Sequence, residues 1–130
     1  MKPEGFPRRL RLRRRREFLR VQRGGRKHHT RYFLVFVRPS IPTGEDRGDA
    51  SRLPPTRLGV TVTRKVGKAV KRNRIKRLVR EAFRRERSVL PAGLDMVWVA
   101  KRDAVDTTYQ AVVDDLHALA TRLSTTAGVR

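Results

Sequence analysis

The residues with the clearest chemical potential are the basic side chains of one segment, residues 64–87, which holds 12 Lys and Arg against two Glu. Apolar residues recur through it at i, i+3, i+4, i+7 and i+8, the spacing of an amphipathic helix that runs to about Arg87. This apolar stripe consists of Ile75, Leu78, Val79, Ala82 and Phe83. Because like charges one turn apart destabilise a helix, so dense a cationic face is typical of a surface that binds a polyanion.

A solvated helical face is the alternative interpretation of this charge run, and most charge runs are of that kind. A surface that only has to stay soluble mixes both signs of charge, whereas this one is nearly all positive. Arginine also outnumbers lysine by 26 to 7 across the chain. That bias suits bidentate phosphate contacts and stacking on bases, although a GC-rich genome would produce the same bias. The residue types favour nucleic acid as the partner.

The charge of the whole chain points the same way. Its 130 residues suffice for one compact domain, and they carry a formal net charge of +21 with a pI near 11.9. Residues 1–31 contribute +11 and residues 64–87 contribute +10, while the remaining residues together are neutral. Two basic segments around a nearly neutral body are typical of a folded domain with a charged surface.

Several function classes are disfavoured by the residues that the chain lacks. It has no Cys and three His, which excludes a disulfide framework and a Cys nucleophile and disfavours a zinc site. No apolar run approaches the roughly 18 residues of a membrane span, and the charged N-terminus does not resemble a secretory signal peptide. We therefore expect a soluble, cytoplasmic protein with no membrane partner.

The periodicity predicts one α+β domain in which helices pack on a small sheet. The predicted elements are a helix over about 14–23, strands over 32–37, 58–63 and 94–100, the basic helix, and a last helix with Asp103 or Asp106 as its candidate cap. The first strand is apolar on both faces, so something should pack on each side of it. The predicted boundaries are a flexible basic arm at 1–9, the domain at 10–124 with a loop insertion at 39–56, and a tail at 125–130.

The basic helix and the strand before it also carry a resemblance. Leu58-Gly59-Val60, Lys65-Val66-Gly67 and the run KRNRIKRLVREAF at 71–83 resemble the signature of the bacterial ribonuclease P protein component, in particular its Arg-Asn-Arg motif. The similarity covers nearly the whole chain apart from the arm, the loop and the tail. A lone Arg-Asn-Arg would mean little in so Arg-rich a chain, but its place on a helix directly after LGVTVTRKVG makes the match specific.

The resemblance implies a fold and a function. The fold is an α/β sandwich with a small mixed sheet, ribosomal protein S5 domain 2-like, with a left-handed βαβ crossover that handedness rules alone would not predict. The function is that of the protein subunit of ribonuclease P, which assists endonucleolytic removal of the 5′ leader from precursor tRNA. The implied partners are the catalytic RNA and precursor tRNA, with no obligate protein partner. The chemistry is assigned to the RNA and to Mg²⁺ held by that RNA, so no catalytic or metal-binding residue is expected in the protein.

The resemblance also assigns binding residues. Those matched to contact with the RNA subunit are Lys65, Arg72, Asn73, Arg74, Lys76, Arg77 and Arg80. Those matched to the leader are Phe18 and Phe36, with Tyr32 on the same strand face and Thr61 and Thr63 on the neighbouring strand. Aromatic rings beside a basic groove bind single strands without reading their sequence, although both Phe residues could instead be ordinary core. Many relatives have a second aromatic residue where this chain has Gln22.

Three rival functions remain open from the residues. A structural RNA-binding protein of ribosomal type would share the charge, the size and the α+β design, but it would need no leader cleft. An autonomous nuclease is disfavoured because Asp103, Asp106 and the scattered His do not form an acid, base and metal constellation. A nonspecific DNA-compacting protein is the third. Salt dependence does not separate them, since each would release counterions on binding.

Overall fold

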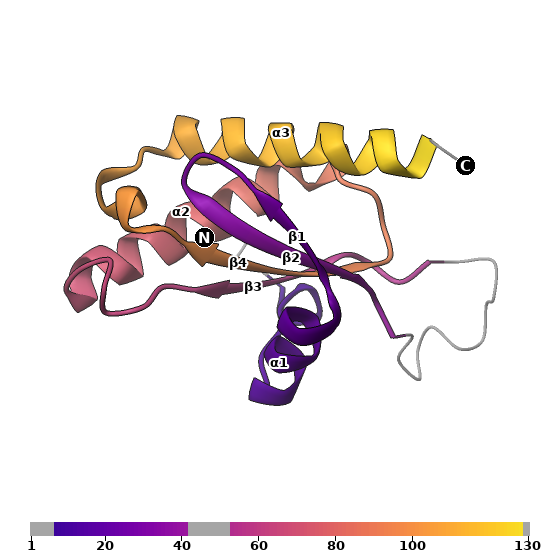
Figure 1. Ribbon diagram of the computed structural model, residues 1–130, viewed down its shortest axis with the longest axis horizontal. Coiled ribbons are helices and arrows are strands. Elements are labelled where there is room, and N and C mark those ends of the chain that lie inside the picture. The colour runs from indigo at the N-terminus through magenta and orange to yellow at the C-terminus, as the bar shows by residue number, and fades with distance from the viewer. Residues whose placement is uncertain (1–6, 42–52, 129–130) are drawn as a thin grey trace, which may run out of the picture.

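A four-stranded mixed sheet forms the centre of the computed structural model, which describes residues 7–41 and 53–128 (Figure 1). The strands are β1 (Arg26–His29), β2 (Phe33–Pro39), β3 (Arg57–Thr61) and β4 (Leu94–Ala100). Their spatial order is β1-β2-β4-β3, with β1, β2 and β4 antiparallel and with β3 parallel to β4. The parallel pair is joined through a helix, which confirms the βαβ unit of the expected fold.

The helices cover the two faces of the sheet unequally. They are α1 (Arg15–Gly24), α2 (Ala69–Glu86) and α3 (Tyr109–Gly128), accompanied by short 3₁₀ helices at Arg8–Leu10, Arg87–Val89 and Arg102–Asp106. Figure 1 shows α2 and α3 on one side of the sheet and α1 alone on the other. No helix among the described residues is long and apolar enough to cross a membrane.

The larger core lies between the sheet and the α2–α3 layer. Its fully buried side chains include Phe33, Ile75, Phe83, Trp98 and Leu116. The Trp98 ring meets the Phe33 ring edge to face, with 5.2 Å between centroids, a favourable aromatic geometry. The apolar stripe predicted for the basic helix is therefore its inner side, and the basic side chains are turned away from the core.

A smaller core lies on the opposite face, beneath α1. Val21 of α1 packs there with Leu12, Phe36 and Val97. Phe18, Leu34 and Val99 border this cluster and are partly buried. Because alternate residues of β2 enter the two cores, the prediction that this strand is covered on both faces is confirmed.

Several predicted boundaries differ from the structure. β1 was not predicted, because its sequence RKHH has no apolar alternation and it pairs with β2 through its backbone. The last helix begins at Tyr109, where the Ala111 amide donates to Thr108 Oγ1, so neither predicted Asp caps it. That helix continues to Gly128, past the predicted start of the tail. Residues 8–10 of the chain's basic start form a 3₁₀ helix, while 1–6 and 42–52 lie outside the described residues.

Candidate nucleic-acid interface

The predicted RNA-subunit residues form one continuous basic surface along α2, which we call the α2 surface. Six of them lie on this helix, and Lys65 is exposed in the turn that precedes it. Asn73, Arg74, Arg77 and Arg80 are exposed, whereas Arg72 and Lys76 are half-buried at the border of the apolar stripe. At 3.6 residues per turn, the side chains at 72, 76 and 80 follow one flank of the helix. The α2 surface therefore presents a row of cations along one flank of the helix.

Arg80 and Arg11 bring two like charges together beside the α2 surface. Arg11 forms an isolated bridge to Leu58, which places it at the outer edge of β3. Burial and the nearby Arg11 guanidinium lower the pKa of Arg80. Burial and a like charge both disfavour the charged form of a guanidinium, so Arg80 lies in a strongly positive part of the surface.

Few acids compensate the α2 surface. Within the helix, Glu81 accepts from Arg84 and Arg85, which lie beyond the matched residues toward its C-terminus. Asp106 accepts from Lys71 at 2.9 Å, and Lys71 is not one of the matched residues. The guanidinium of Arg72 donates to the Gly67 carbonyl at 2.9 Å, which fixes the turn before the helix. No described carboxylate is bonded to the six basic residues assigned to the RNA subunit.

A buried ionic network attaches α1 to the sheet. Asp95 of β4 is fully buried and accepts from Ser40, from Arg20 of α1 and, at two positions, from Arg57 of β3. The Asp95 hydrogen bond is the largest cause of the raised pKa of Arg57. Arg57 also donates to Glu17 at 2.9 Å. Burial opposes ionisation of Glu17, but the Arg14 and Arg13 amides and the Arg57 guanidinium together lower its pKa.

Gly59 allows α1 to lie close to the sheet. A Cβ at this position would lie 2.7 Å from the Phe18 ring and 3.3 Å from Leu12 Cβ. These distances are too short for any side chain to fit without displacing the ring. Packing therefore requires a glycine at this position of the strand, because the Phe18 ring occupies the space of a Cβ.

We predict that Gly59→Ala lowers the free energy of unfolding by about 1–3 kcal/mol, the usual cost of overpacking. Urea denaturation followed by circular dichroism measures this change. Gly24→Ala is the matched control, since its added Cβ meets the end of the flexible Arg38 side chain and no ring. Equal stability of the two variants would contradict the role assigned to Gly59.

The predicted leader residues do not all share one face. Phe18 is half-buried against the sheet, and Thr61 is half-buried on the same side. Phe36 is only 9% exposed, so it supports α1 and offers little surface for stacking. Thr63 lies beyond the end of β3 and is exposed.

The prediction that Tyr32 shares the face of Phe36 is wrong. Tyr32 precedes β2 in a bend, and its side chain packs against the larger core. Its amide donates to Asp115 of α3 at 3.0 Å. The bend breaks the alternation on which the prediction depended, and the ring therefore faces the α3 side.

The described residues offer no metal centre of their own. No three His, Asp or Glu side chains gather within the described ranges. Asp95 and Glu17 are engaged by guanidinium groups, and Asp115 accepts from Thr30 and the Tyr32 amide. Since these carboxylates do not fit Mg²⁺, which prefers oxygen ligands in octahedral geometry, we derive no metal-dependent step from this chain.

Fold and surface together define a class of protein: a small α+β domain with a strongly cationic helix on one side of its sheet and a single helix, α1, on the other. The family model for ribonuclease P matches residues 6–124. The protein component of Desulfovibrio desulfuricans is 44% identical over 121 residues, which cover 92% of this chain and 86% of that protein. The Thermotoga maritima component is 41% identical over 99 residues, covering 76% and 75%.

Solved structures agree with the sequence relatives. The ribonuclease P protein of Thermotoga maritima superposes with a TM-score of 0.70 at 35% identity, covering 86% of this chain and 96% of that one. The Staphylococcus aureus protein gives 0.68 at 27% identity, covering 92% and 96%. The chain belongs to the family of bacterial ribonuclease P protein components. Its role is that of a subunit of this endoribonuclease in tRNA processing.

Proposed function

We propose that this subunit binds the catalytic RNA through the α2 surface and the 5′ leader of precursor tRNA across the α1 side of the sheet. In this proposal the RNA subunit holds Mg²⁺ and hydrolyses the phosphodiester bond, and the protein contributes binding and positioning. The complex works in the cytoplasm with no obligate protein partner. The observation that carries the proposal is the row of cations on α2, whose matched basic residues are bonded to no described carboxylate.

The α2 surface suits a structured RNA because it is rigid. Ile75, Val79 and Phe83 hold the helix to the sheet, so its basic side chains are presented in a fixed spacing. Guanidinium groups bind phosphate in a bidentate manner, which gives orientation as well as affinity. Binding through these contacts would order the catalytic RNA relative to the rest of the domain.

The α1 side suits a single strand because it combines a partly accessible apolar surface on the sheet with helix α1 along its border. Phe18, Leu34 and Val99 all border the smaller core and stay partly accessible, and Thr61 is half-buried opposite Val99. Bases can stack on such a surface whatever their sequence. A subunit that accepts many different leaders requires binding of this kind. The buried position of Phe36 means that this chain relies on the accessible residues for contact and on Phe36 for support.

Cleavage of a 5′-extended precursor tRNA at low Mg²⁺ tests the proposal. The protein alone, a ribonuclease P RNA from the same source alone, and both together are compared. We expect efficient cleavage only in the combined sample. Cleavage by the protein alone would contradict the assignment of chemistry to the RNA, and the absence of enhancement would favour the alternative of a ribosomal-type binder.

A further inference from the structure

One row of side chains crosses the entire sheet on the α1 side and stays partly accessible. In register, His29 of β1 lies opposite Leu34 of β2, Leu34 opposite Val99 of β4, and Val99 opposite Thr61 of β3. Paired residues of neighbouring strands share a face, so these four form one line, which we call the open row. Leu34, Val99 and Thr61 are half-buried and His29 is exposed.

The adjacent row is closed by α1. It consists of Lys27, Phe36, Val97 and Gly59, of which all but Lys27 are buried. Helix α1 begins after Leu12, whose amide donates to Leu58 of β3, and it ends at Gly24, directly before β1. The helix therefore crosses the sheet from one edge strand to the other. It forms a wall beside the open row over its whole length, about 14 Å for four strands spaced about 4.8 Å apart.

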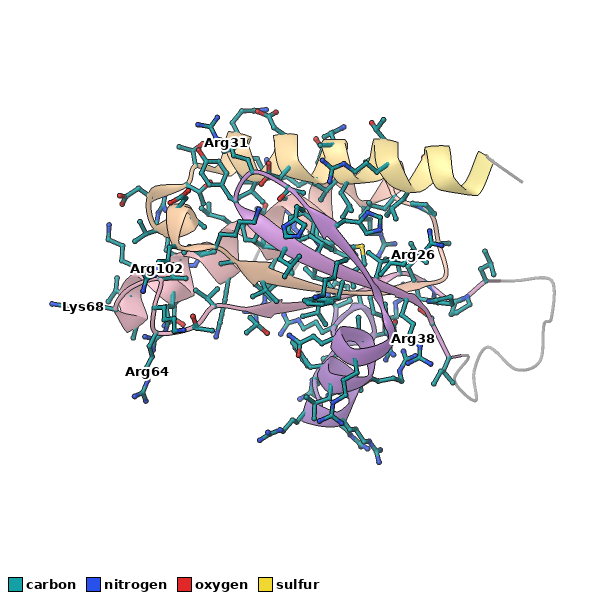
Figure 2. The ribbon with its side chains drawn as sticks, viewed as in Figure 1. Arg26, Arg31, Arg38, Arg64, Lys68 and Arg102 are labelled. Carbon is teal, nitrogen blue, oxygen red and sulfur yellow. The ribbon has the colours of Figure 1, made fainter. Side chains whose placement is uncertain are left out.

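The two ends of the open row are both basic. At the β3 end the chain enters the turn with Arg64 and Lys65, next to the α2 surface. At the opposite end is β1, whose sequence with the following bend, residues 26–31, is RKHHTR and contains no acid. Figure 2 shows Arg31 near the top of the view and Arg26 at the right, whereas Arg64 and Lys68 lie at the lower left.

Only half of the β1 side chains lie on the α1 side of the sheet, the side of the open row. Lys27 and His29 pair with Phe36 and Leu34 and so lie on the α1 side, and Lys27 Nζ is 5.9 Å from the Phe36 ring centroid. Arg26 and His28 pair with Val37 and Val35 and lie on the α3 side. His29 is also fixed in the backbone, because Arg122 of α3 donates to its carbonyl.

We propose that β1 is the exit of the leader path, where Lys27 and His29 hold the phosphates of the leader nucleotides farthest from the cleavage site. This rests on the proposed function, since the α2 surface places the catalytic RNA at the other end of the open row. A single-stranded leader that follows the open row passes the apolar side chains of β4 and β2 and then reaches β1. There it meets the ammonium group of Lys27 and the imidazole of His29.

The test is the affinity of the assembled enzyme for precursors whose leaders are shortened one nucleotide at a time. Lys27→Ala with His29→Ala should weaken the longest leaders about tenfold, the size of a lost charged hydrogen bond, and leave the shortest unchanged. Arg26→Ala with His28→Ala is the matched control, because it removes the same kinds of side chain from the opposite face of β1. It should match wild type at every length, and Lys27→Arg alone should retain wild-type affinity.

Each other outcome overturns the exit path. An equal loss at all lengths, a loss shared by the control pair, or no loss at any length would remove Lys27 and His29 from the leader contact. In those cases the wild-type enzyme still prefers long leaders, and the proposed function stands. If the wild-type affinity does not depend on leader length at all, the leader half of the proposed function fails together with the inference.

Discussion

Replacement of Asp95 by Asn is expected to lower the free energy of unfolding by about 3–5 kcal/mol, the typical cost of breaking a buried ion pair by removing one partner. Asn keeps the volume of the side chain but loses the charge that two guanidinium groups share. Arg57 contacts this carboxylate at 2.9 and 2.8 Å, and Arg20 contacts it from α1. Both Arg side chains are about four-fifths covered, so water compensates them poorly.

The loss should appear first in the position of α1. Because Arg20 joins the helix to β4, its release would loosen the wall that buries Phe36. Denaturant unfolding measures the stability, and hydrogen exchange of the α1 amides measures the local opening. Asp103→Asn, at an exposed position, is the control that changes the same charge. A stability within about 1 kcal/mol of wild type would show that the network is not the anchor of α1.

Removal of two cations from the α2 surface is expected to weaken assembly with the catalytic RNA by about tenfold or more for each side chain, the scale of a charged hydrogen bond. Arg77→Ala with Arg80→Ala changes two exposed residues and leaves the apolar stripe intact. If each residue contacts one phosphate, the slope of log K against log salt should become shallower by about 1.4–1.8. Helical content should remain that of wild type.

The control for charge alone is an equal change elsewhere. Arg23→Ala removes an exposed cation from α1, on the other side of the sheet from α2. Binding to the catalytic RNA, measured over a salt series, should keep the wild-type slope in this variant. If Arg23→Ala and the α2 double variant lost equal affinity per charge, the interaction would depend on net charge and not on the α2 surface.

The sequence alone determined the elements whose signals are local. The apolar stripe predicted the basic helix, and the structure places its buried residues on that stripe. The strand at 94–100 has the predicted bounds, with Trp98 in the core. These predictions succeed because side-chain periodicity reports which side of an element is buried, and because a cationic run of this density is informative without coordinates.

Only the tertiary structure decided which of these elements meet. β1 is held by backbone pairing, which leaves no pattern in RKHH, and its register is what brings Lys27 and His29 beside Phe36 and Leu34. The burial of Phe36 depends on α1, which is anchored through Asp95, a residue 75 positions away from Arg20. Contacts such as the β1–β2 register and the Arg20–Asp95 ion pair join residues of different elements. Local periodicity reports only which side of one element is buried, so it does not predict them.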